Sequence, residues 1–226
     1  VQRLLKTFRE DGAASIRHRL RGRPSNNRLR EGLRAYTLAI VREFRDRDTT
    51  TPIVLMGYLN PVEYYGWEKF ATNAKSAGVD GLLIVDCPPE EADSVRPVLA
   101  KHGLDQIFLA SPTTTDARIA TMGELAQGYV YYVSFAGITG ADLLVMADVG
   151  ARLDELRQTI RVPIAVGFGV KTAVQAAALA PHADAVVVGS ALVEQLAAAT
   201  SLTDAQHRAR EFLRPFLEKK NIQVIS

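Results

Sequence analysis

Short apolar runs alternate with longer amphipathic segments from residue 52 onward. Six runs of five or six residues have the Val-, Ile- and Tyr-rich composition typical of strands that are buried on both faces. They are Ile53–Tyr58, Gly81–Asp86, Gln106–Ala110, Tyr129–Ser134, Ile164–Phe168 and Ala185–Gly189. The segments between them have the spacing of amphipathic helices and are Pro61–Ala77, Pro88–His102, Asp116–Ala126, Ala151–Ile160 and Lys171–Leu179. One strand and one helix in about every 20 to 35 residues predicts βαβ units and a parallel sheet.

Six strand–helix units are predicted, whereas a closed (β/α)₈ barrel has eight. The first 50 residues contain no β-rich apolar run and predict a helix, a basic linker and a second helix at Val1–Glu10, Arg17–Arg30 and Glu31–Arg45. We therefore expect an α/β fold of the (β/α) TIM-barrel type that lacks the first two strand–helix units and is preceded by a basic helical arm. In such an open barrel Ile53–Tyr58 and Ala185–Gly189 would be unpaired edges, shielded by the N-terminal helices or by dimerisation.

Composition places the chain among ordinary globular proteins. Of its 226 residues, 47% are hydrophobic and 23% are charged. No apolar run approaches the roughly 20 residues that span a bilayer, so we expect no membrane association. Cys87 is the single cysteine, so an internal disulfide is excluded. A lone cysteine and the lack of a recognisable signal peptide favour a cytoplasmic location. Because the chain begins at Val1 and not at Met, we expect its natural start to lie upstream.

Charge divides the chain into two parts. Residues 1–34 hold ten Lys or Arg against three acidic residues, a net charge of +7, although the whole chain carries only +2. The remainder is therefore net acidic. This asymmetry indicates a basic helical arm over residues 1–37, suited to an anionic partner, and a partial barrel over residues 38–226.

Glycines follow the last two predicted strands. In (β/α) barrels the reacting groups lie at the C-terminal ends of strands, and phosphate commonly binds after strands seven and eight. Gly169 and Val170 follow one strand, Gly189 and Ser190 follow the next, and each pair precedes a predicted helix. Glycine lets backbone N–H groups approach an anion closely, and the helix N-terminus adds a favourable dipole. The pattern predicts a phosphate site; the alternative is a pair of tight strand-to-helix turns.

A third glycine-rich loop, residues 136–142, follows the strand Tyr129–Ser134. Its Thr139 and Gly140 suit a lid that closes over a substrate and excludes water. The alternative is an ordinary surface loop.

Several segments together resemble the alpha subunit of tryptophan synthase. They are Pro52–Pro61, Ala77–Gly81, Val85–Glu91, Gly128–Ser134, Gly137–Gly140, Gly167–Gly169 and Gly189–Ala191. The resemblance covers about residues 38–220, in order and without large gaps. It implies a lyase of tryptophan biosynthesis, which cleaves indole-3-glycerol phosphate by a retro-aldol step to indole and glyceraldehyde 3-phosphate. It also implies a beta-subunit partner that uses pyridoxal phosphate, with no cofactor or metal in this chain.

Site residues follow from the resemblance, position by position. Phosphate would be held by Gly140, Gly169, Val170, Gly189 and Ser190. Tyr131 would lie beside the glycerol part, Thr139 on the lid, and Tyr58 and Phe168 near the indole. The side that meets the beta subunit would include Asn60, Pro61, Asp86 and Pro88. For Tyr131 and Phe168 the alternative is barrel core.

The two carboxylates that the family's reaction needs have no counterpart here. Neither the Gly-x-Pro-x-Ser-Asp-Pro segment nor the Ala-Asp-Gly-Pro loop that carry them occurs in the sequence. Among the acids near strand ends, Asp86 belongs to the subunit boundary, Glu90 and Glu91 suit a first helical turn, and Glu43 and Asp48 precede a strand. We therefore assign no catalytic residue and expect impaired activity. The alternative functions are a non-catalytic remnant that binds a phosphate ligand or the beta subunit, and a DNA-binding fusion.

The last alternative rests on the N-terminal arm. Residues 1–14 and the Arg21–Asn26 stretch resemble the end of a helix-turn-helix region in bacterial transposases. An Arg-Gly-Arg-Pro arm could enter a minor groove and bind nucleic acid weakly, with strong salt dependence. The alternative is a solvated basic tail. The break in charge and pattern indicates a truncated or fused chain, joined near residues 33–40.

Overall fold

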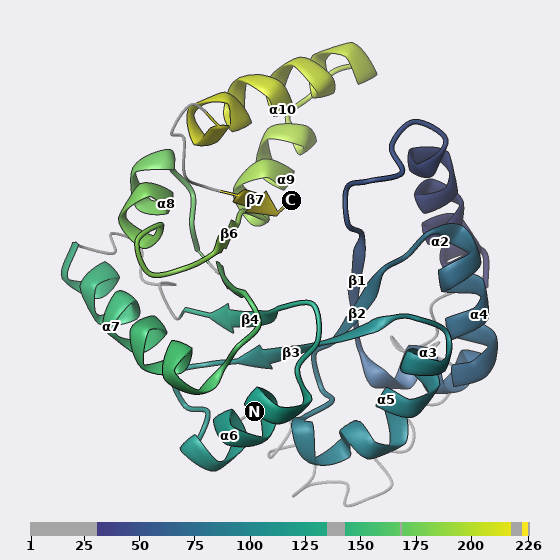
Figure 1. Ribbon diagram of the computed structural model, residues 1–226. Coiled ribbons are helices and arrows are strands. Elements are labelled where there is room, and N and C mark those ends of the chain that lie inside the picture. Colours follow the sequence, from purple (N-terminus) through teal and green to yellow (C-terminus); the bar gives the residue numbers. More distant parts are fainter. Residues whose placement is uncertain (1–30, 135–142, 168, 218–222, 226) are drawn as a thin grey trace, which may run out of the picture.

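The computed structural model describes residues 31–134, 143–167, 169–217 and 223–225. Its centre is one curled sheet of seven parallel strands in chain order, with the helices on the outer face (Figure 1). The strands are β1 (Val54–Gly57), β2 (Gly81–Ile84), β3 (Asp105–Ala110), β4 (Val130–Val133), β5 (Ile164–Gly167), β6 (Ala185–Val187) and β7 (Gln223–Ile225). Each of the six predicted strands is confirmed, with shorter bounds at most ends, and the fold is of the TIM-barrel type.

The helices alternate with the strands as the amphipathic segments predict. They are α2 (Glu31–Arg45), α3 (Leu59–Tyr65), α4 (Trp67–Ala77), the 3₁₀ turn η1 (Pro89–Glu91), α5 (Ala92–Lys101), α6 (Asp116–Leu125), α7 (Leu143–Thr159), α8 (Ala173–Leu179), α9 (Ser190–Ala197) and α10 (Leu202–Leu217). Where one helix was predicted over Pro61–Ala77 there are two. Gly66 separates them at φ 91°, a conformation that favours glycine.

The expected unpaired edge at Ala185–Gly189 is wrong. Strand β7 pairs with β6 in parallel, with Ala185 opposite Gln223 and Val187 opposite Ile225. At the other end of the sheet, β1 pairs with β2, and no second neighbour of β1 is found among the described residues. The C-terminal end of the chain therefore supplies a strand that the apolar pattern did not reveal.

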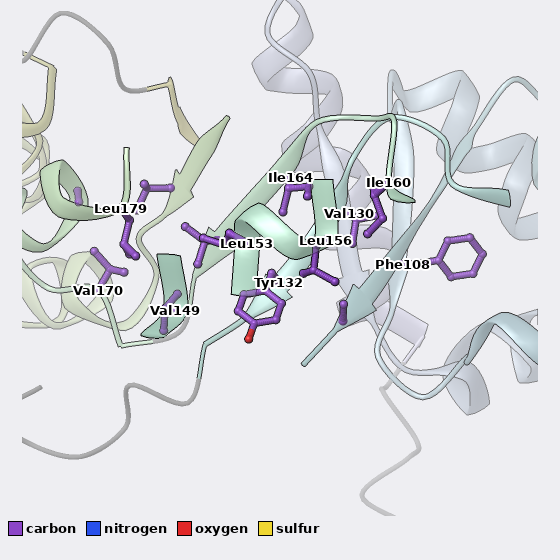
Figure 2. Packing of buried hydrophobic residues seen from close by; sticks show 14 of the residues in the cluster. Phe108, Val130, Tyr132, Val149, Leu153, Leu156, Ile160, Ile164, Val170 and Leu179 are labelled. Carbon is purple, nitrogen blue, oxygen red and sulfur yellow. The ribbon is translucent and has the colours of Figure 1, made fainter. Parts of the chain in front are cut away.

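Side chains alternate between the two faces of the sheet. On β4, Val130 and Tyr132 pack on the helix side in one hydrophobic cluster with Leu153 and Leu156 of α7 (Figure 2). Because successive strand residues point to opposite faces, Tyr131 lies on the concave, inner face. A second cluster is built around β2, α4 and α5 and includes Leu38 and Val41 of α2. The two clusters between the sheet and its helices thus form the core, and residues that alternate with them along the strands, such as Leu83, Ile107 and Ala165, are buried on the inner face.

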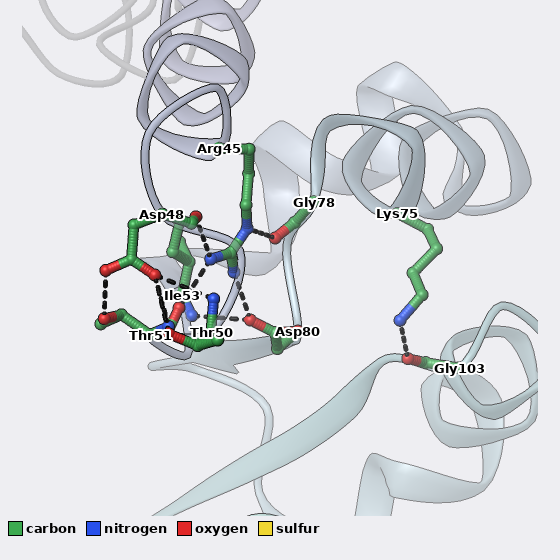
Figure 3. Close-up of polar contacts among 9 residues, drawn as sticks. All are labelled: Arg45, Asp48, Thr50, Thr51, Ile53, Lys75, Gly78, Asp80 and Gly103. Carbon is green, nitrogen blue, oxygen red and sulfur yellow. Dashed lines mark hydrogen bonds and ion pairs between the residues drawn. The ribbon is translucent and has the colours of Figure 1, made fainter.

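An arginine ties α2 to the first two strands at their N-terminal ends. Arg45 donates from Nε to the carbonyl of Gly78 (2.9 Å) and from Nη1 to that of Thr51 (2.7 Å), and it forms an ion pair with Asp80 (2.7 Å) (Figure 3). The Asp80 carboxylate also accepts the N–H of Ile53 at 2.8 Å. The predicted boundary between residues 37 and 38 thus falls inside α2, a helix that is fastened to the barrel.

No helix in the described ranges is long and apolar enough to cross a membrane. The same residues contain no group of three or more His, Cys, Asp or Glu side chains that could hold a metal ion.

Candidate phosphate and partner site

The turn after β5 is built for a close backbone approach. β5 ends at Gly167, and Gly169 follows with φ 85°, the left-handed region that side chains other than glycine rarely adopt. Val170 is buried in the outer cluster and fixes the far side of the turn. Helix α8 then begins with a capping box, in which Thr172 and Gln175 bind each other's backbone N–H groups. Gln175 Oε1 also accepts the N–H of Lys171 at 2.8 Å. The side chains of the capping box therefore already satisfy the N–H groups of Lys171, Thr172 and Gln175 around the start of α8.

The next turn differs, because helix α9 has no side-chain cap. Its N-cap residue is Gly189, which has no side chain that could accept a hydrogen bond from the first N–H groups of the helix. Gly189 and Ser190 are both exposed, and a Cβ added to Gly189 would meet no atom within 4 Å. The N–H of Leu192 donates to the Gly189 carbonyl at 3.0 Å, so the N–H groups of Ser190 and Ala191 are the ones that an anion at this helix N-terminus would use. The Ser190 hydroxyl stands at the first position of the same helix.

Tyr131 reaches from β4 toward these two turns along the inner face. A Cβ added to Gly167 would collide with this residue's hydroxyl, and it would lie 2.8 Å from the Cβ of Val187 of β6. The glycine at 167 is therefore required by the tyrosine. Burial raises the pKa of Tyr131, so its hydroxyl stays protonated and able to donate a hydrogen bond at neutral pH.

The predicted partner-side residues gather at the C-terminal ends of β1 and β2. Asn60 and Pro61 lie in α3, and Pro88 precedes η1. The Asp86 carboxylate accepts the N–H of Leu59, the first residue of α3, at 2.7 Å. The exposed Asp86 therefore caps a helix that starts after the neighbouring strand, a role that its position at a strand end did not reveal.

The structure places the predicted substrate residues in two groups. Tyr131, Gly169, Val170, Gly189 and Ser190 lie at or beside the ends of β4 to β6, whereas Tyr58 follows β1 and is 60% exposed. Thr139, Gly140 and Phe168 lie outside the described residues. Binding of substrate by any of these residues stays a prediction.

The carboxylates considered as substitute acids mostly have other partners. Glu90 pairs with Arg118 (2.6 Å), and Glu43 pairs with Arg47 (2.7 Å). Asp48 accepts hydrogen bonds from Thr51 and Thr50, which hold its pKa far below the usual range, so it stays ionised at neutral pH. These three groups hold loops and helices, which agrees with assigning them no catalytic role.

One polar residue at this end of the barrel escaped the sequence reasoning. Ser134 follows β4 and is buried, and its hydroxyl donates to the carbonyl of Gly167 at 2.9 Å. A serine after a strand carries no pattern that separates it from a loop residue. Only the pairing of β4 with β5 shows what it contacts.

A curled parallel sheet of strands in chain order, with helices on its outer face and glycine turns at its C-terminal edge, defines a (β/α) fold of the TIM-barrel type. The family model of the tryptophan synthase alpha chain matches residues 24–221, and the chain belongs to this family. The match begins ahead of residue 38, where the motif resemblance starts, and so includes part of the predicted basic arm.

The sequences of related proteins agree with this assignment. The tryptophan synthase alpha chain of Xylella fastidiosa (strain 9a5c) is 53% identical over 181 residues, which are 80% of this chain and 68% of that protein. That of Xanthomonas oryzae pv. oryzae (strain PXO99A) is 54% identical over 182 residues, with the same coverage.

Solved structures of the family share the fold. The tryptophan synthase subunit alpha of Legionella pneumophila str. Paris gives a TM-score of 0.73 at 40% identity, covering 82% of this chain and 68% of that one. A chain from the tryptophan synthase α2β2 complex of Pyrococcus furiosus gives 0.70 at 31% identity, covering 94% and 79%.

Proposed function

We propose that this chain binds indole-3-glycerol phosphate, or a similar phosphorylated small molecule, and has lost most of the family's retro-aldol lyase activity. The observation that carries the proposal is the uncapped N-terminus of α9. Gly189 and Ser190 are exposed there, and a Cβ added to Gly189 would meet no atom within 4 Å. An anion at a helix N-terminus is stabilised by about 0.3–1 kcal/mol, in addition to the hydrogen bonds that it accepts.

The neighbouring groups supply what a phosphate ester needs beyond that helix. Gly169 makes a left-handed turn after the adjacent strand, so its backbone can approach an anion closely. Tyr131 offers a protonated hydroxyl on the inner face for the polar part of the ligand that follows the phosphate. These contributions come from different strands, as the C-terminal edge of a barrel allows.

Weak catalysis follows from the two missing carboxylate motifs. General acid or base catalysis by one positioned side chain contributes about 10²–10⁴-fold to a rate. Glu90 and Glu43 are engaged in ion pairs, and Asp48 in hydrogen bonds to its own loop. Substrate would therefore be bound and cleaved slowly.

The beta subunit is the proposed protein partner. The sequence resemblance implies that Asn60, Pro61, Asp86 and Pro88 lie on the side that meets this partner. The support is that the hydrogen bond from Leu59 to Asp86 fastens the loop ends of β1 and β2 together. Asp86→Ala removes the cap of α3, so we expect weaker binding to a beta subunit in sedimentation, with phosphate binding unchanged. Equal sedimentation of variant and parent would remove Asp86 from the interface.

Titration calorimetry with glycerol 3-phosphate tests the phosphate site. Gly189→Asp places a carboxylate in front of α9, and we expect binding to fall below detection. Gly189→Ala is the matched control, because its Cβ meets no atom within 4 Å and adds no charge. Binding that survives in Gly189→Asp, or that is absent from the parent protein, contradicts the proposal.

A further inference from the structure

Ser134 is an unusual residue in this core. Among the residues that the structure describes, the buried polar side chains are those of Gln106 and Ser134, each about 1% exposed. Burying a hydroxyl without a hydrogen bond costs free energy, so a buried serine requires a partner. The hydroxyl of Ser134 donates to the carbonyl oxygen of Gly167 at 2.9 Å.

The same carbonyl receives a second hydrogen bond from the same residue. The backbone N–H of Ser134 donates to the Gly167 oxygen, also at 2.9 Å. Val133 and Gly167 are register partners in the β4–β5 ladder, so this backbone bond continues the ladder by one step. Any residue but proline could make it. The hydroxyl bond is therefore additional to strand pairing and specific to residue 134.

The carbonyl that Ser134 holds is the last one of β5. A peptide unit is planar, so fixing the C=O of Gly167 restricts the direction in which the chain leaves the strand. Gly167 has no side chain to hold it, and a Cβ there would collide with the Tyr131 hydroxyl. Two residues further along, Gly169 makes the left-handed turn. The hydroxyl bond thus acts at the point where the strand becomes the turn.

We propose that Ser134 is a positioning residue: its hydroxyl orients the turn at Gly169 and, through that turn, the phosphate site. The role in ligand binding rests on the function proposed above, whereas the orientation of the turn does not. Ser134 touches no ligand in this account, and it acts through the Gly167 carbonyl.

Ser134→Ala removes the hydroxyl bond and leaves the backbone bond in place. The matched control is Ser94→Ala, because Ser94 also donates from its hydroxyl to a backbone carbonyl, that of Glu91 at 2.8 Å, at an exposed position of α5. Ser134→Thr keeps a hydroxyl at the position. Thermal unfolding of all variants separates loss of stability from loss of positioning.

Two measurements decide the proposal. Amide hydrogen exchange at Gly169 and Val170, without ligand, should be several-fold faster in Ser134→Ala and unchanged in Ser94→Ala. Calorimetry with glycerol 3-phosphate should show about 3- to 10-fold weaker binding in Ser134→Ala, the size expected for one hydrogen bond. Ser134→Thr should recover most of that affinity.

The outcomes separate this proposal from the proposed function. Unchanged exchange at Gly169 and Val170 in Ser134→Ala overturns the positioning role, whether or not phosphate binds. Faster exchange with unchanged affinity overturns its extension to the ligand. If the parent protein does not bind glycerol 3-phosphate, the proposed function fails, and the exchange measurement alone still decides whether Ser134 orients the turn.

Discussion

Gly167→Ala is expected to destabilise the chain through a specific collision. A Cβ at this position would overlap the Tyr131 hydroxyl and lie 2.8 Å from Val187 Cβ and 3.0 Å from Tyr131 Cζ. Both neighbours project from adjacent strands of the sheet, so neither can move away freely. Overpacking of this kind costs about 1–3 kcal/mol. At Gly189 a Cβ meets no atom within 4 Å, so Gly189→Ala should change stability by less than about 0.5 kcal/mol.

Urea denaturation followed by circular dichroism measures both changes. Adding Tyr131→Phe removes the nearest oxygen but leaves Cζ and Val187 close, so the double variant should recover only part of the loss. The coupling energy of the two substitutions should then be about 0.5–1.5 kcal/mol. Additive effects, or equal stability of Gly167→Ala and Gly189→Ala, would refute the packing of Tyr131 against β5.

Four further outcomes are expected. Arg45→Lys keeps the charge but cannot donate to Gly78, Thr51 and Asp80 together, so urea denaturation should show a loss of about 1–3 kcal/mol. Hydrogen bonds from Thr51 and Thr50 lower the pKa of Asp48 in the folded state. These bonds stabilise the folded state fully above the ordinary Asp pKa of about 3.9, and the stabilisation is lost as the pH falls toward the lower folded-state pKa. Asp48→Asn should therefore reduce the acid sensitivity of thermal unfolding, and an identical pH profile would contradict this. Removal of residues 218–226 deletes β7 and exposes the edge of β6, so light scattering should show concentration-dependent association. If residues 1–37 act as a DNA-binding arm, a mobility shift should appear at low salt and vanish at high salt; no shift at low salt would exclude that role.

The periodic part of the fold was predictable from the sequence. Six strands were found because each is a short apolar run between amphipathic helices. Helix α2 was found at Glu31–Arg45 from its own pattern. Strand β7 was missed because three residues carry no periodicity, and pairing with β6 is a tertiary effect. The break at Gly66 was missed because a single glycine is tolerated within many helices.

The site was predictable only where it depends on backbone chemistry. Gly169 and Gly189 were expected at strand ends, and the structure places them there. The contacts of Ser134 and Asp86 were not foreseen, because each joins residues that lie 33 and 27 positions apart along the chain. Gly167 was expected near the end of the strand Ile164–Phe168, but its dependence on Tyr131 follows only from the packing of two strands.

The central claim is that the chain keeps the substrate phosphate site without the acid–base pair. The most direct test mixes indole-3-glycerol phosphate with this chain and with the Xylella fastidiosa alpha chain, each with and without a beta subunit, and measures both binding and indole release. We predict saturable binding with indole release at least about 100-fold slower than from the relative, because one positioned acid or base is worth at least that factor. Release at the relative's rate, or no binding, would contradict it.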